Sequence, residues 1–137
     1  MKQIIEKITF KTKPCEIVNI TQEIKEILKN TNIEQGLLNL SILHTSCSLM
    51  IQENADNTVM IDIKNFLNKI APENGYFHNS KGPDDMPAHL KSLLTQTNLT
   101  LSVRKKILIL GIWQGIFLLE HRNSNKIREV FFHLIGD

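Results

Sequence analysis

Three histidines of this chain lie in polar segments whose composition is suited to chemistry. His44 begins the run His-Thr-Ser-Cys-Ser, His78 lies in a Gly- and Pro-rich segment, and His89 follows the stretch 83–88, Pro-Asp-Asp-Met-Pro-Ala. Neutral imidazole is the commonest metal ligand, and histidine is the only residue with an unperturbed pKa near physiological pH. We therefore take His44, His78 and His89 as candidate ligands of a divalent metal ion, zinc or magnesium, and expect no organic cofactor.

Carboxylates flank these histidines. If the adjacent Asp84 and Asp85 converged on one point, their repulsion would require a cation or raise one pKa. Asp85 lies one turn before His89 on an expected helix start, where it could cap backbone N–H groups or accept a hydrogen bond from the imidazole. Asp56 is suited to helix capping, so Glu53 is the better candidate for catalysis.

Apolar periodicity predicts the elements that must position these groups. Strands are expected over residues 2–10, 15–20, 36–43, 46–52, 98–103, 106–110, 114–122 and 126–135. Thr21 is expected to cap a helix that ends near Asn30, and a second helix starts at Asn54 or Asp56 and ends before Pro72. A third is expected to begin at Asp85. The sum is an α+β fold with a mainly antiparallel sheet and two or three helices, in a single domain over residues 1–137.

Two details of this expectation concern packing. Apolar residues at helical spacing predict the buried face of the second helix: Val59, Ile63, Phe66, Leu67 and Ile70. The segment Asn123-Ser-Asn125 is typical of a hairpin turn and is expected to join the last two strands.

Composition excludes several classes of protein. Lys and Arg number 16 against 14 Asp and Glu, so the charge balance favours neither nucleic acid nor anionic membrane as a partner. No apolar stretch approaches the ~20 residues of a membrane span, and the charged N-terminus argues against a signal peptide. The only two cysteines, Cys15 and Cys47, are far apart in sequence, so we expect no disulfide and a cytoplasmic location.

Four motifs occur in order along the chain: His44-Thr-Ser-Cys-Ser, Glu53-Asn-Ala-Asp56, the run from Asp84 to Ser92, and Gly111-Ile-Trp-Gln-Gly-Ile116. With them, nearly the whole chain resembles the YjbQ-like family, small proteins sometimes labelled secondary thiamine-phosphate synthase. The resemblance implies an α+β homotrimer with a polar pocket near the subunit boundary. That pocket would gather the histidines and acidic residues and could hold a metal ion.

The residues and the resemblance, taken together, lead us to expect roles for particular side chains. The expected catalytic residues are His44, His89, Glu53 and Asp85. The expected contacts to a small phosphorylated substrate are Thr45, Ser46, Asn54, Gln114 and Arg122. No motif surrounds His121 or His133, so they are not site candidates.

Two positions depart from the family pattern. Ile112 stands where threonine is usual, so any contact made by that hydroxyl is lost here. Cys47 stands where a small residue is usual, and it could be a thiol nucleophile beside His44 or a buried, inert side chain. Trp113 is expected to pack in the core or between subunits.

Three functions remain open at this level. Mg²⁺ held by Asp84, Asp85 or Glu53 would serve the joining of a pyrimidine pyrophosphate to a thiazole phosphate with loss of pyrophosphate. Imidazole ligands suit zinc better, and a zinc site with an open position would serve hydrolysis. A trimer that binds a metal or a metabolite without turnover would use the same residues.

Overall fold

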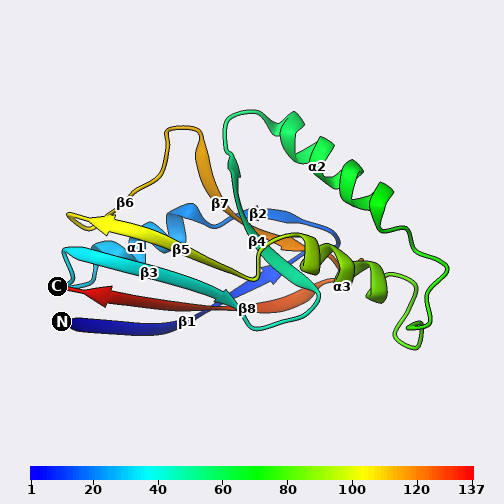
Figure 1. Ribbon diagram of the computed structural model, residues 1–137, viewed down its shortest axis with the longest axis horizontal. Helices are drawn as coiled ribbons and strands as arrows, with labels where there is room; N and C mark the ends of the chain where they lie inside the picture. The colour runs from blue at the N-terminus through cyan, green and yellow to red at the C-terminus, as the bar shows by residue number, and fades with distance from the viewer.

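The computed structural model describes residues 1–137 as two antiparallel sheets and three helices (Figure 1). The strands are β1 (Lys2–Thr12), β2 (Ile17–Asn19), β3 (Gln35–Ile42), β4 (Cys47–Glu53), β5 (Asn98–Arg104), β6 (Ile107–Leu108), β7 (Gln114–Glu120) and β8 (Lys126–Gly136). The helices are α1 (Thr21–Lys29), α2 (Asn57–Ile70) and α3 (Asp85–Leu94). The predicted α+β class is therefore confirmed.

The larger sheet has the strand order β1-β8-β3-β5-β6, and the smaller has the order β2-β7-β4. Along β8, alternate residues such as Val130 and Phe132 are fully buried, and they face the core together with Leu38 and Leu40 of β3. This is the two-residue period that a sheet with one covered face requires.

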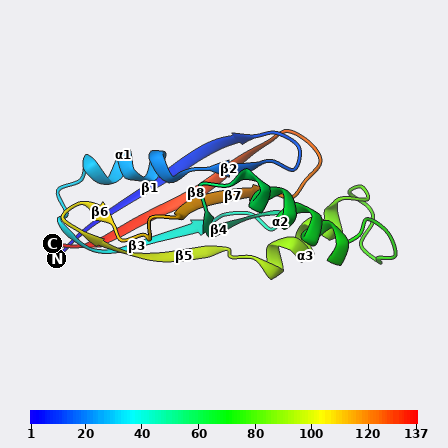
Figure 2. The same ribbon diagram turned by 90° about the horizontal axis from the view of Figure 1, so that it is seen from above.

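Strand β7 is buried on both faces. Ile116 and Leu118 belong to the main core, which α1 completes, whereas Phe117 and Leu119 form a second cluster with Leu67 of α2. The smaller sheet therefore lies between the main core and α2. Figure 2 shows α1 along one side of the strands, with α2 and α3 toward the end opposite the two termini. None of the helices is both long enough and apolar enough to cross a membrane.

Local signals determined the helix starts only in part. Asp56 rather than Asn54 caps α2, because its side chain accepts the backbone N–H of Thr58 at 2.9 Å. Helix α1 begins at Thr21, but the expected Thr21 cap is wrong: Asn19 Oδ1 accepts the Thr21 N–H at 3.1 Å.

Two packing predictions are also wrong. Strands β7 and β8 lie in different sheets, so the segment around Asn123–Asn125 carries the chain between the sheets and is not a hairpin turn. On α2 only Leu67 is buried, and Phe66 remains 60% exposed and Ile70 42% exposed. The reason is visible in Figure 1, where α2 lies to the side of β4 and β7 and no other element covers its outer side.

The end of the larger sheet near the chain termini depends on two glycines in paired interior strands. Gly36 of β3 and Gly136 of β8 are register partners. A Cβ atom on Gly36 would collide with the carbonyl of Ile135, and one on Gly136 with the carbonyl of Gln35. Both obstacles are backbone atoms of paired strands, which cannot turn aside as a side chain can.

We expect Gly36→Ala to lower the free energy of unfolding by about 1–3 kcal/mol, because the added methyl group must push the paired strands apart. Urea unfolding followed by circular dichroism measures this. Gly111→Ala is the matched control, since its methyl group would meet only the flexible side chain of Gln114. Equal stability of the two variants would contradict the packing argument.

Candidate metal-binding and catalytic site

Three side chains at the start of α3 and in the loop before it direct ligand atoms toward one point. One ring nitrogen of His78, one of His89 and one carboxylate oxygen of Asp85 all lie within 4.8 Å of one another. Asp85 and His89 share a face of α3 because they are four residues apart. His78 Nε2 lies 2.7 Å from Asp85 Oδ2, and His89 Nε2 lies 3.4 Å from the same oxygen.

The protonation of the His89 ring is set by its neighbour. Nδ1 of His89 lies 2.8 Å from the carbonyl oxygen of Thr45. A carbonyl can only accept, so Nδ1 carries the proton, and in the neutral ring Nε2 keeps a free lone pair. An outer hydrogen bond of this kind is what orients a metal-binding imidazole. Thr45 thus contributes its backbone to the site.

The two aspartates do converge, and the cation that this requires is the guanidinium of Arg122. Its Nε donates to Asp84 at 3.0 Å, its Nη1 donates to Asp85 Oδ1 at 2.6 Å, and its Nη2 donates to the carbonyl of Lys81 at 2.9 Å. Arg122 therefore holds Asp85 in place, and the donors that we expected to contact a substrate phosphate are directed at protein groups.

These contacts determine the charge on Asp85. Burial, with only 4% of the residue exposed, would by itself raise the pKa of Asp85. The hydrogen bond with His78 and the charges of Arg122 and His89 outweigh burial, so the pKa of Asp85 lies below its usual value. Asp85 is consequently an ionised carboxylate whose Oδ2 faces the two imidazoles.

The structure does not bring the His44 side chain into this group. Nε2 of His44 accepts the backbone N–H of Glu129 at 2.8 Å, so the nitrogen is occupied in joining β8 to the end of β3. Burial, followed by the charge of Arg128, lowers the pKa of His44 and keeps the ring neutral. The structure thus gives His44 a positioning contact instead of a place beside His78 and His89.

Ser46 also lies away from the imidazoles, in a buried ionic network. Its hydroxyl accepts from Arg128 at 2.9 Å, and Arg128 donates to Glu120 at 2.5 and 2.6 Å. Burial would raise the pKa of Glu120, but the hydrogen bonds from Arg128, from the Arg122 backbone and from Thr12 lower it overall. This network fixes the loop that supplies the Thr45 carbonyl.

The remaining predicted residues lie at the far end of β4. Glu53 is the register partner of Gln114, and the amide of Asn54 donates to the Gln114 carbonyl at 3.2 Å. The Gln114 side chain accepts the backbone N–H of Gly111 at 2.7 Å. Since a strand rises about 3.3 Å per residue, the six steps from Cys47 to Glu53 separate these groups from the imidazoles by about 20 Å within one chain.

The two departures from the family pattern have different surroundings. Cys47 is fully buried, and burial raises the pKa of its thiol to about 12, which favours the inert side chain over the nucleophile. Ile112 and Trp113 are 83% and 61% exposed, so the expectation that Trp113 packs in the core of this chain is wrong.

Sequence reasoning missed two buried polar side chains beside this site. Lys91 was not considered as a site residue, and His121 was set aside because no motif surrounds it. Both side chains are buried, and both line two cavities between α2, α3 and the end of β7. No local pattern marks them, because the cavities form only where α2, α3 and the end of β7 meet.

Comparison with known proteins gives one consistent family. The family model described as UPF0047 protein YjbQ-like matches residues 6–137. UPF0047 protein YjbQ of Salmonella typhimurium is 43% identical over 95% of this chain and 96% of its own length. UPF0047 protein sll1880 of Synechocystis sp. is 38% identical over 99% of this chain and 94% of its own length.

A solved structure of similar fold is the conserved hypothetical protein TT1486 from Thermus thermophilus. It is 36% identical, with a TM-score of 0.83, and the match covers 95% of this chain and 99% of that one. A yjbq/upf0047 family protein from Clostridium acetobutylicum, 28% identical, gives a TM-score of 0.87 over 95% of this chain and 99% of its own.

We expect Glu120→Gln to lower the free energy of unfolding by about 3–5 kcal/mol, because the variant leaves Arg128 as a buried charge without a carboxylate. Glu129→Gln is the matched control. Its carboxylate pairs with Lys7 at 3.2 Å near the surface, and losing such a pair costs less than about 1 kcal/mol. Urea titrations of both variants provide the comparison, and a loss under about 1 kcal/mol for Glu120→Gln would refute the role of the network.

Proposed function

Because the chain belongs to the YjbQ-like UPF0047 family, we propose from its own site that it is a metal-dependent enzyme acting on a small phosphorylated molecule. One observation carries the proposal: the ligand atoms of His78, Asp85 and His89 lie within 4.8 Å of one another. The substrate class rests on the resemblance to proteins labelled secondary thiamine-phosphate synthase.

The donor set fits a transition metal better than magnesium. Two imidazoles and one carboxylate suit zinc and similar ions, whereas Mg²⁺ prefers oxygen ligands. Three protein ligands leave a coordination position open, as catalytic zinc sites do. The His78 and His89 side chains are 42% and 31% exposed, so this position is accessible to a small molecule.

The protein's own groups prepare the site. A bound ion of this kind would supply Lewis-acid chemistry, either polarising a phosphoryl oxygen or activating water. The Thr45 carbonyl keeps the proton of His89 on Nδ1. Arg122 occupies Asp85 Oδ1 and leaves Oδ2 toward the imidazoles. Nε2 of His78 carries the proton that it now donates to Asp85, so for this nitrogen to be a ligand the neutral ring must hold its proton on Nδ1 instead.

We expect the purified protein to bind one zinc ion per subunit, and His89→Ala and Asp85→Asn to lose it, because each removes one of three ligands. Metal analysis after gel filtration measures this. His44→Ala is the matched control and should retain the metal, since its Nε2 is bonded to the Glu129 backbone. Zinc retained by His89→Ala would exclude these ligands, and zinc lost from His44→Ala would restore His44 as a ligand.

The reaction is tested on the same preparations. Zinc-dependent release of phosphate from small phosphate esters supports hydrolysis, which the imidazole ligands favour. Joining of a pyrimidine pyrophosphate to a thiazole phosphate, stimulated by Mg²⁺, supports thiamine-phosphate synthesis. Absence of both activities from the metal-loaded protein contradicts an enzyme of either type and leaves the non-catalytic binding protein.

We also propose that the chain assembles as a homotrimer, as the family resemblance implies. The outer face of the larger sheet exposes apolar side chains that nothing in the chain covers: Ile5 is 52% exposed, Leu37 51% and Ile135 38%. Leu37 and Ile135 are register partners, so their exposed side chains adjoin, and exposed apolar surface is a feature of interaction sites. In such an assembly, Glu53 and Gln114 of one subunit could lie near the imidazoles of another subunit.

Light scattering during gel filtration tests the assembly. We expect a mass three times that of the chain for the wild type, and a smaller mass for the double variant Leu37→Lys and Ile135→Lys, because charges replace neighbouring apolar side chains on that face. Gln22→Lys, on the exposed side of α1, should leave the mass unchanged. A monomeric wild type would rule out the trimer.

We propose a cytoplasmic location as well. Cys15 and Cys47 are both free, and a reducing compartment keeps thiols in this form.

A further inference from the structure

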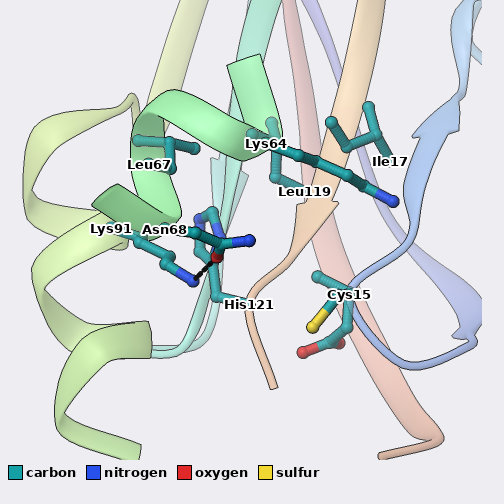
Figure 3. A pocket seen from close by; sticks show the side chains of 9 residues that line it. Cys15, Ile17, Lys64, Leu67, Asn68, Lys91, Leu119 and His121 are labelled. Carbon is teal, nitrogen blue, oxygen red and sulfur yellow. Dashed lines mark hydrogen bonds between the residues drawn. The ribbon is translucent and has the colours of Figure 1, made fainter. Parts of the chain in front are cut away.

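Two adjoining cavities lie between α2, α3 and the end of β7. The smaller one has a volume of about 40 Å³ and the wider one about 340 Å³. Both are lined by Cys15, Asn68, Lys91 and His121, which Figure 3 shows around a shared space. This space is separate from the metal site. Lys91 follows His89 by two residues, and helical residues two apart point about 200° away from each other.

The ammonium group of Lys91 has no counter-charge. Lys91 is only 9% exposed, and its Nζ donates to a single neutral acceptor, Oδ1 of Asn68, at 2.6 Å. No aspartate or glutamate forms an ion pair with it. Lysine is rarely buried unless it is paired, because removing a charge from water is costly. A buried lysine that faces a cavity without a carboxylate therefore indicates a missing anionic partner.

The acidic residues around the cavities do not supply this partner. Glu120 is committed to Arg128 and Thr12, and Asp84 to Arg122 and the backbone of Asn123. Glu73 lines only the wider cavity and is exposed. Lys64 lines only the smaller cavity and is likewise exposed. Lys91 is therefore the buried charge in the lining of these cavities that lacks a counter-charge.

Neutral polar groups accompany the ammonium. Because Oδ1 of Asn68 accepts from Lys91, the Asn68 amide nitrogen is left to donate, and in Figure 3 it points away from Lys91 into the space. Nε2 of His121 bonds to Ser48 at 2.8 Å, and Nδ1 has no protein partner. Burial, and next the charge of Lys91, lower the pKa of His121 to about 4, so the ring adds no second charge.

We propose that this space binds the oxyanion group of a small molecule, a phosphate or a carboxylate, with Lys91 as its counter-charge and Asn68 and His121 as neutral hydrogen-bonding groups. Lysine binds phosphate as a point charge, and the volume of the wider cavity is within the range of small-molecule sites.

Inorganic phosphate and, separately, malonate are titrated into the full chain at constant ionic strength, with calorimetry and NMR of the His121 ring as readouts. We expect saturable binding of at least one anion, one per chain, with shifted His121 signals. Lys91→Met should weaken binding roughly tenfold or more, because a charged hydrogen bond is lost. Lys25→Met, on the exposed side of α1, should bind as the wild type does.

Two further comparisons separate this site from other roles of Lys91. His89→Ala should bind the anion as tightly as the wild type does, although it is expected to lose zinc. The proposed metal site and the proposed anion site can therefore be refuted independently. Without an anion, Lys91→Met should be at least as stable as the wild type, because it removes an uncompensated buried charge; a structural lysine would give the opposite change. Phosphate-only or malonate-only binding identifies the oxyanion.

A measurement on the wild type keeps the proposal testable if Lys91→Met does not fold. Cys15 lines both cavities, and the buried thiol of Cys47 is unreactive, so alkylation by iodoacetamide reports on Cys15. We expect phosphate or malonate to slow this alkylation. The proposal is overturned by absence of saturable anion binding, by equal affinity in Lys91→Met, or by an unchanged rate of Cys15 alkylation.

Discussion

The candidate site depends on one guanidinium group, that of Arg122, which bonds to Asp84 and Asp85 at the start of α3. Without this cation the adjacent carboxylates would repel each other, and one would turn outward or take up a proton. With it, both remain ionised. Oδ1 of Asp85 is held by Arg122, and Oδ2 faces His78 and His89. A carboxylate anchored on one side is a rotationally fixed ligand on the other, which is how a second layer of contacts orients a metal site.

Local periodicity predicted most of the elements, since Val130, Phe132 and the other alternating residues of β8 must bury one face. It could not predict which sheet a strand joins. The turn at Asn123–Asn125 looks like a hairpin locally, yet β7 pairs with β2 and β4, because its side chains are apolar on both faces and need cover on both. The predicted burial of Phe66 on α2 was wrong for a related reason. Phe66 has the spacing of a core residue, but no other part of the chain covers it.

The candidate site, too, could be predicted only where its geometry depends on residues that are close in sequence. The proximity of Asp85 and His89 could be predicted, because four residues on a helix is a local relation. The position of His78 depends on a loop that Arg122 and Asp85 fix from outside, and His44 is diverted by the backbone of Glu129. The Glu53 and Gln114 motifs lie at the other end of β4. The order of the motifs therefore predicts candidate site residues, but it does not predict which of these residues lie close together in the fold.

Helix α3 contributes residues to both proposed sites, one for a cation and one for an anion. One of its faces carries Asp85 and His89, which attract a cation, and the other carries Lys91, which lacks an anion. Asp84 lines the wider cavity beside Lys91 and shares Arg122 with Asp85. An anion bound in the wider cavity would therefore lie near Asp84, which bonds to the guanidinium that orients the metal ligand. Arg122 is one route by which the proposed sites could be coupled, since it bonds to both aspartates.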